Sequence, residues 1–310
     1  MYLKHFGLSR MPFESISNGS VYVDVPEHRE AFNTVVFGLR SGDGFIKIVG
    51  EVGMGKTALC RNLLSRLEPR FRKIYLPNPA IHGRDLLLSI ADELAIDVPA
   101  EAGLHMLQKV IRDELIETTR RGGRVAVFVD EAQTMPGDTL EELRLLSNLE
   151  SNHGKLVQVV LFGQPELDEN LAAYSLRQLQ QRIAFSARLL PLDRHSCRQY
   201  IDRRLARAGA GANPIFSAPT RRRIHRASGG IPRLINVLCH KSLIAAFTEG
   251  TRQVEPRHVA RAIRDTEGLA RWRNPGLSPG WTAIHPGRTR WSRRPWFSFR
   301  QGNGFDEPHQ

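Results

Sequence analysis

The sequence GEVGMGKT at residues 50–57 interrupts the chain with three glycines and a lysine, between an apolar run and a segment of helical periodicity. Phe45 to Val49 is predicted to be a short buried strand, and residues 57–67 carry leucines at helical spacing. The loop fits the pattern GxxxxGK[ST], in which glycines let the backbone approach an anion closely and aim several N–H groups at it. Strand, glycine loop and helix in this order predict a phosphate-binding loop.

Each residue type in this loop has a physical role. The helix that follows adds the positive end of its dipole to the anion site. Lys56 is expected to reach the β- and γ-phosphates of a nucleotide, and the hydroxyl of Thr57 is expected to ligate Mg²⁺. The predicted ligands are therefore ATP and Mg²⁺. The nucleotide-binding residues expected here are Gly50, Glu51, Val52, Gly53, Met54, Gly55, Lys56, Thr57 and Ala58.

Two acids follow another apolar run, at residues 125–129. Ligands of open α/β sheets bind at the carboxyl ends of strands, where Asp130 and Glu131 are expected to lie. Asp130 is the candidate Mg²⁺ ligand, and Glu131 is the candidate base that polarises water. Gln164, just past the apolar run at residues 156–162, is expected to sense the γ-phosphate or to orient that water. The alternative for all three is a structural role in a loop.

Strands and helices alternate through the first part of the chain. Apolar runs predict strands at residues 45–49, 73–76, 125–129 and 156–162, with a fifth within 182–192. The segments between them have helical periodicity, which together predicts an α/β fold with a parallel sheet flanked by helices. After Pro191 the pattern is helical only, at residues 195–208, 219–227, 232–248 and 255–265. We therefore expect an α/β nucleotide-binding domain over residues 1–191 and a small all-helical domain over 192–267.

The last segment, residues 268–310, has proline and glycine throughout, no sustained period, and all four tryptophans. We expect this tail to be disordered in isolation. Because its basic residues interleave with aromatic ones, docking to a membrane interface, to nucleic acid or to a partner is the alternative to a dispensable tail.

The formal net charge of +12 is unevenly distributed. Residues 186–265 carry 16 Lys and Arg against 5 Asp and Glu, whereas residues 1–185 carry 21 against 24. A basic segment attracts nucleic acid, anionic lipid or an acidic protein, and a solvated helical face explains the same charge.

Two features bear on where the protein works. No apolar run reaches the ~18 residues that a membrane-spanning helix needs, and the N-terminus lacks the apolar centre of a secretory signal. The cysteines Cys60, Cys197 and Cys239 lack the spacing of a zinc site or of a disulfide framework. We expect a cytoplasmic protein with reduced cysteines.

These motifs together resemble the AAA+ ATPases, and among them the ExeA/GspA-like group linked to secretion and pilus assembly. The likeness covers roughly residues 1–267 and rests on HFGLSRMPF, GEVGMGKT, VFVDEAQ, LFGQPELDENL, LRQLQQRI and ASGGIPRLINVLCHKSL. Within the group, the arrangement is most similar to the MshM-type ATPases of mannose-sensitive haemagglutinin (MSHA) pilus biogenesis. The resemblance implies a P-loop NTPase fold followed by a helical lid domain.

The resemblance assigns further roles. Arg233, at the start of a lid helix, matches the arginine that reaches the γ-phosphate within the same subunit. Arg177 and Arg182 fall where such proteins carry the arginine finger that enters a neighbour's site, and Arg182 is the preferred one. Phe6 and Phe13 match residues that flank the adenine.

The implied protein is a homo-oligomeric ATPase whose partners are pilus or secretion assembly proteins at the inner membrane. Some relatives continue into a transmembrane helix and a peptidoglycan-binding region that this sequence does not show, so any membrane attachment is expected to be peripheral. The alternative is a DNA-associated ATPase of the origin-recognition or transposition type, since those share the architecture and the helical region is basic. A nucleotide switch with slow turnover is a third reading.

Overall fold

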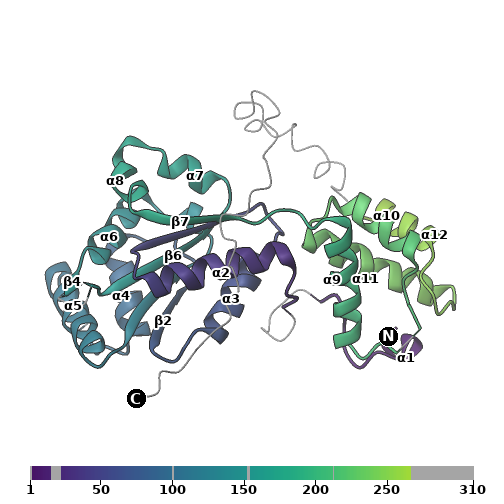
Figure 1. Ribbon diagram of the computed structural model, residues 1–310, viewed down its shortest axis with the longest axis horizontal. Coiled ribbons are helices and arrows are strands. Elements are labelled where there is room, and N and C mark those ends of the chain that lie inside the picture. The colour runs from purple at the N-terminus through teal and green to yellow at the C-terminus, as the bar shows by residue number, and fades with distance from the viewer. Residues whose placement is uncertain (1, 15–21, 100, 152–153, 212, 267–310) are drawn as a thin grey trace, which may run out of the picture. The chain divides into compact units, whose positions relative to one another are not determined.

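The computed structural model describes residues 2–14, 22–99, 101–151, 154–211 and 213–266 (Figure 1). Its strands are β1 Phe45–Val49, β2 Phe71–Leu76, β3 Arg124–Val129, β4 Glu150–Ser151, β5 Gly154–Lys155, β6 Val157–Gly163 and β7 Ile183–Arg188. Its α-helices are α1 Leu3–Phe6, α2 Pro26–Ser41, α3 Lys56–Arg66, α4 Gly83–Glu93, α5 Leu104–Arg120, α6 Gly137–Ser147, α7 Glu166–Leu171, α8 Arg177–Gln180, α9 Arg194–Arg207, α10 Ala218–Ser228, α11 Pro232–Thr248 and α12 Pro256–Arg264. Single 3₁₀ turns lie at η2 Ala132–Thr134 and η3 Tyr174–Leu176. The tail, residues 268–310, lies outside the described residues.

Within the described residues, a five-stranded sheet has the order β2-β3-β6-β1-β7, and all of its neighbouring strands pair in parallel. The α/β fold with a parallel sheet that the alternation predicted is therefore confirmed. Because β1 lies between β6 and β7, the loop after β1 leaves from inside the sheet. The carboxyl ends of β1, β3 and β6 meet at one edge, where ligands of such sheets bind.

Both faces of the sheet are covered by helices, which explains the unbroken apolar run of β3. Val125, Val127 and Val129 pack on one face with residues of α4, α5 and α6. Ala126 and Phe128 point to the opposite face and pack with residues of α2 and α3. Alternate side chains of one strand therefore supply two cores, and the strand end is held rigidly from both sides.

The helices α9 to α12 enclose a third core. The N-terminal segment joins this core, because Tyr2, Phe6, Leu8 and Phe13 are buried within it. We call α9 to α12 the lid. The division of the chain at residue 191 stays a proposal, and the first residues contribute to the lid core although they precede the sheet in sequence.

Helix α2 was not among the elements that the sequence analysis predicted. It places Ala31, Val35 and Leu39, spaced by four residues, against the sheet, and Pro26 occupies its first turn. Among the described helices, none has the length together with the apolar character that crossing a bilayer requires.

Candidate functional site

The backbone of the loop between β1 and α3 has a conformation that depends on its glycines. Gly53 and Gly55 have φ of +82° and +93°, a region that side chains with a Cβ rarely adopt. Gly55 is also the N-cap of α3 and offers no side-chain acceptor to the first turn. The N–H groups that normally need a capping partner at a helix start are thus left for a ligand.

Lys56 is buried beside this loop, with 5% of its surface exposed. Its ammonium group donates hydrogen bonds to the carbonyl oxygens of Gly50, at 2.7 Å, and Glu51, at 3.3 Å. Burial lowers the pKa of Lys56, and the nearby carboxylates of Glu131 and Asp130 oppose that shift. A negatively charged ligand such as a phosphate can replace these two neutral carbonyl oxygens as the hydrogen-bond acceptor of the ammonium group.

Asp130 lies at the end of β3 and is 3% exposed. Its carboxylate accepts hydrogen bonds from the N–H of Glu131, at 3.1 Å, and from the hydroxyl of Tyr75, at 3.4 Å. Burial raises the pKa of Asp130, while a hydrogen bond from the Thr57 side chain lowers it. No ion pair of Asp130 occurs in the described part of the chain. A buried carboxylate next to a hydroxyl offers the hard oxygen ligands that Mg²⁺ prefers, so these residues fit that ion.

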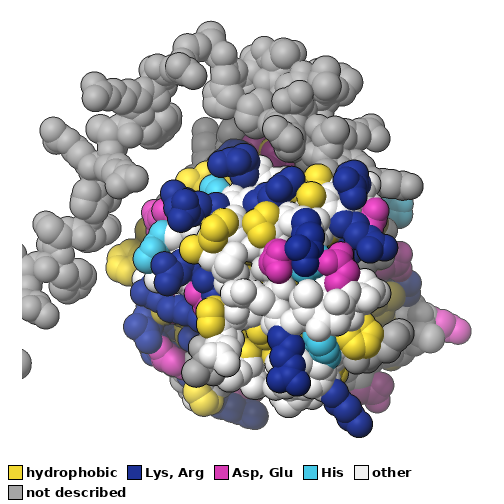
Figure 2. Space-filling model, turned by 90° about the vertical axis from the view of Figure 1, so that its right-hand side faces the viewer, with side chains coloured by type: hydrophobic (Ala, Val, Ile, Leu, Met, Phe, Trp, Pro, Cys, Tyr) yellow, Lys and Arg dark blue, Asp and Glu magenta, His cyan; other side chains and the backbone are white. Residues whose placement is uncertain are grey.

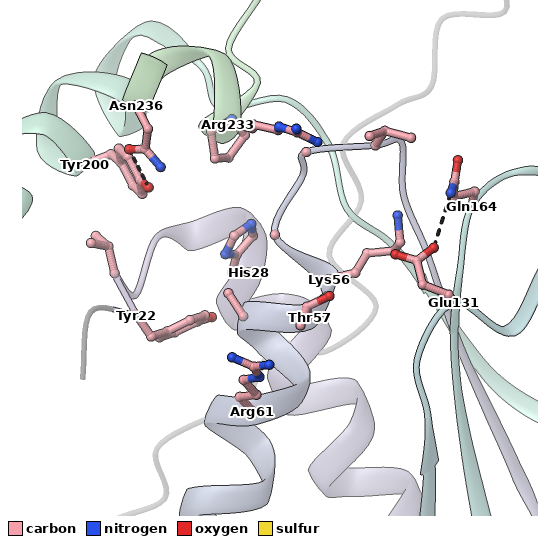
Figure 3. A pocket seen from close by; sticks show the side chains of 16 residues that line it. Tyr22, His28, Lys56, Thr57, Arg61, Glu131, Gln164, Tyr200, Arg233 and Asn236 are labelled. Atoms are coloured by element: carbon pink, nitrogen blue, oxygen red, sulfur yellow. Dashed lines mark hydrogen bonds between the residues drawn. The ribbon is translucent and has the colours of Figure 1, made fainter. Parts of the chain in front are cut away.

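Glu131 is held by two glutamine side chains. Its Oε2 accepts a hydrogen bond from the Nε2 of Gln133 at 2.7 Å. It accepts another from the Nε2 of Gln164 at 3.2 Å (Figure 3). Gln133 in turn accepts a hydrogen bond from the backbone N–H of Gln164 at 3.0 Å. Glu131 itself has a left-handed backbone, with φ of +53°, which is uncommon for a residue other than glycine. The ends of β3 and β6 are therefore linked through Glu131 and Gln164, which the sequence analysis put in one site, and through Gln133, which it did not predict.

A cavity of about 390 Å³ opens above the loop and lies within the size range of small-molecule sites. Gly53, Gly55, Lys56, Thr57, Glu131 and Gln164 line one end of it. Tyr22, Val23, His28, Tyr200, Asn236 and Arg233 line the other, with Arg61 beneath Tyr22 in Figure 3. The cavity thus extends from the carboxyl edge of the sheet to the N-terminal segment and the lid.

Phe6 and Phe13, which the resemblance matched to residues that flank the adenine, are buried in the lid core. Neither lines the cavity. Phe6 packs edge-on against Tyr2, and Phe13 packs edge-on against Phe216, both within the lid core. In this core the two large apolar rings are removed from water, which stabilises the packing of the N-terminal segment on the lid.

His28 joins α2 to the phosphate loop. Its Nε2 donates a hydrogen bond to the carbonyl of Met54 at 2.8 Å, so the proton of the neutral ring lies on Nε2. Burial lowers the pKa of His28, which keeps the ring neutral. Gly55 passes so close that a Cβ there would lie 3.0 Å from the Cε1 of His28. The imidazole therefore holds the loop in place through its hydrogen bond to Met54 and its contact with Gly55.

Arg233 brings the lid to the loop. Its backbone N–H donates a hydrogen bond to the carbonyl of Gly53 at 3.1 Å. A Cβ on Gly53 would lie 2.9 Å from the Cβ of Arg233, so only glycine allows this approach. The Arg233 side chain lines the cavity and makes no hydrogen bond or ion pair with any other described residue.

Arg177 and Arg182 lie away from the cavity and do not line it. Arg177 begins α8, is exposed, and stacks on the ring of Tyr174 with 4.3 Å between its guanidinium carbon and the ring centroid. Arg182 precedes β7 and is half-buried. The structure does not bring either arginine to the cavity of its own chain.

Sequence analysis missed several residues of the site, because no local motif marks them. They are Tyr22, Val23, His28, Arg61, Gln133, Tyr200 and Asn236. Two signals were available. Gln133 follows the acid pair within the first turn after the strand, and the apolar spacing of α2 together with Pro26 predicts the helix that carries His28.

The burial of Asp130 leads to a prediction. An acid whose folded pKa is raised favours the folded state while it is protonated, and that contribution is lost as the pH rises through its folded pKa. Asp130→Asn resembles the protonated form, so at pH ~8 its melting temperature without ligand should equal or exceed that of the parent. Mg·ATP should stabilise the parent and leave the variant unchanged in a thermal melt.

The matched control is Asp92→Asn, which removes one carboxylate from an exposed position of α4. It should keep the full shift with Mg·ATP. A large Mg·ATP shift in Asp130→Asn would show that this carboxylate is not needed to hold the ion.

The chain matches known proteins in two ways. Residues 39–171 match a family model described as an AAA domain. Over 270 residues the chain is 44% identical to general secretion pathway protein A of Aeromonas hydrophila, a match that covers 87% of this chain and 49% of that protein. The chain therefore spans about half the length of this curated relative.

Solved structures share the fold. Cdc6p from Pyrobaculum aerophilum superimposes with a TM-score of 0.64 at 22% identity, covering 81% of this chain and 69% of that one. The ADP form of Aeropyrum pernix ORC2 gives a TM-score of 0.62 at 16% identity, covering 83% and 72%. At these identities the likeness shows the fold alone. The chain therefore has a P-loop fold with an AAA domain match over residues 39–171, and it is similar to general secretion pathway protein A.

Proposed function

We propose that this protein is an ATPase that supports the assembly of a secretion machinery or of a type IV pilus of the MSHA kind. One observation carries the proposal: the 44% identity to general secretion pathway protein A extends over 87% of this chain, through both the sheet and the lid. The protein would act on the cytoplasmic side of the inner membrane, attached peripherally, with assembly proteins as partners.

The phosphate loop and Lys56 would hold the nucleotide. The ammonium of Lys56 exchanges its two backbone carbonyls for phosphate oxygens, and the loop amides add further donors. Thr57 and Asp130 would hold Mg²⁺, which supplies positive charge against the phosphates when bound.

Glu131 would act as the base that takes a proton from water. The two amides that hold its Oε2 fix the side chain and leave Oε1 for this task. Gln164 is bonded to Glu131 from the neighbouring strand end, so it can orient the same water. Gln133 is a positioning residue in this arrangement, because it holds both Glu131 and the backbone of Gln164.

Arg233 would couple the site to the lid. It already lies against Gly53, and its guanidinium has no protein partner among the described residues. A contact with the γ-phosphate would then hold the lid on the loop, and hydrolysis would release it. In a homo-oligomer, a neighbouring copy would supply Arg182 or Arg177 as the finger that stabilises charge in the transition state.

The test is genetic and uses the native cell. A chromosomal Glu131→Gln allele should abolish either surface pili or the secreted proteins, because a protein that binds ATP without turnover stalls its partners. Glu166→Gln, which removes an exposed carboxylate outside the cavity, is the control and should leave both intact. The pattern of loss separates a pilus role from a secretion role. A Glu131→Gln strain that makes pili and secretes as the parent does would contradict the proposal.

A further inference from the structure

The acids of the lid are all engaged by the lid itself. Residues 186–265 contain 5 Asp and Glu residues and 16 Lys and Arg residues. Four of them form ion pairs with arginines of the same region, and Asp193 caps α9 by accepting a hydrogen bond from the N–H of Ser196 at 2.7 Å. The four ion-paired acids are Asp202, Glu249, Glu255 and Asp265. The lid therefore carries more exposed cations than its own carboxylates neutralise.

The unpaired cations concentrate on α10. Arg222, Arg223 and Arg226 are exposed and make no hydrogen bond or ion pair with any residue that the structure describes. The opposite side of the helix is buried through Ile224 and Ala227. We call these three arginines the α10 arginine surface. Figure 2 looks onto the right-hand side of Figure 1 and shows Lys and Arg side chains spread widely over that face, with acidic and apolar side chains between them.

We propose that the α10 arginine surface binds the phosphodiester backbone of double-stranded nucleic acid, without reading its sequence. Arg222 and Arg226 are separated by one turn, about 6 Å along the helix. That distance is close to two phosphate steps of one strand, which follow each other every ~3.4 Å along the duplex axis. Three neighbouring guanidinium groups with no competing carboxylate can each donate to a phosphate.

The choice of arginine supports a phosphate ligand. Residues 186–265 contain a single lysine, Lys241. The planar guanidinium donates two parallel hydrogen bonds to one phosphate, which an ammonium group cannot do. A surface that served only solubility would not need this geometry.

The surroundings of the surface disfavour a lipid bilayer. Proteins that lie on membranes combine cations with large apolar side chains that enter the headgroup region. None of the exposed large apolar side chains described in the chain belongs to α10 or to α12, which packs beside it. The surface offers charge without an apolar anchor, which fits the outside of a duplex.

The experiment measures binding of the full-length protein to a fluorescein-labelled random-sequence duplex by anisotropy across a KCl series. The variant Arg222→Gln, Arg223→Gln, Arg226→Gln should bind on the order of 100-fold more weakly near ~0.1 M salt. The slope of log affinity against log salt should fall by about 2.7, or about 0.9 for each phosphate that the variant no longer neutralises. Each single substitution should lower the slope by about 0.9, which keeps the test valid if the triple variant folds poorly.

The matched control removes the same charge from α5, through Lys109→Gln, Arg112→Gln and Arg120→Gln, all exposed. It should keep the parent slope, and both variants should keep parent ATP turnover because none of these residues lines the cavity. An unchanged slope in the α10 variant, or an equal loss in the α5 control, would overturn the proposal. So would binding to vesicles containing phosphatidylglycerol that depends on α10 while duplex affinity does not.

Discussion

Nucleotide binding should be lost when Lys56 is replaced by alanine. Lys56 is the buried cation of the phosphate loop, and it makes two hydrogen bonds to loop carbonyls that phosphate oxygens can replace. A hydrogen bond to a charged group contributes about 1.5–3 kcal/mol. Two such bonds therefore account for about 3–6 kcal/mol, so the affinity for Mg·ATP should fall by about 10²–10⁴-fold, as measured by isothermal titration calorimetry.

The fold should survive this substitution. A base whose folded pKa is depressed, as burial depresses that of Lys56, disfavours the folded state while it is charged, and stability rises as the pH increases toward its unfolded pKa. Removing the ammonium group relieves this cost, and cavity water can reach the Gly50 and Glu51 carbonyls it leaves. The melting temperature without nucleotide should therefore stay near the parent value. Lys109→Ala, on the exposed face of α5, should bind as the parent does. Parent-like heat on titration of Lys56→Ala would contradict the role given to Lys56.

The parts of the fold that sequence predicted are those whose cause is local. The apolar run Val125 to Val129 predicted a strand, and the side chains of this strand divide between two cores. The acids that follow it could be placed because parallel strands end at one edge. The phosphate loop could be predicted from its own eight residues together with the strand before it and the helix after it. In each case the physical constraint acts within a few residues of the motif.

The parts that sequence did not predict depend on contacts between distant residues. The chemistry of Phe6 and Phe13 allows them either to line a cavity or to fill a core. They lie in a core because they pack against the lid helices, which follow some 200 residues later in the chain. Tyr22 reaches the cavity because the chain returns from the lid to the sheet at that point. Gln133 joins Glu131 to Gln164 only because β3 and β6 are neighbours. Such pairings are set by topology, which no local pattern contains.

Turnover should stop in Glu131→Gln while ATP remains bound. The amide of glutamine has nearly the same shape as the carboxylate of glutamate. Its Oε1 can still accept the two hydrogen bonds that Gln133 and Gln164 donate to Glu131 Oε2 in the parent protein. What it lacks is basicity, and general base catalysis contributes about 10²–10⁴-fold to a rate. Steady-state phosphate release should fall by that factor, whereas calorimetry should give a parent-like affinity for Mg·ATP.

The control separates proton transfer from simple charge. Glu166 lies close enough to raise the pKa of Lys56, yet it is exposed and does not line the cavity. Glu166→Gln removes the same unit of charge from the neighbourhood of the phosphate loop, so it should change turnover less than about threefold if Glu131 acts as a base. Equal losses in the two variants would mean that the negative potential around Lys56, and not a proton acceptor at Glu131, sets the rate. Parent-like turnover in Glu131→Gln would remove Glu131 from the chemistry and leave Gln164 as the strand-end residue able to orient water.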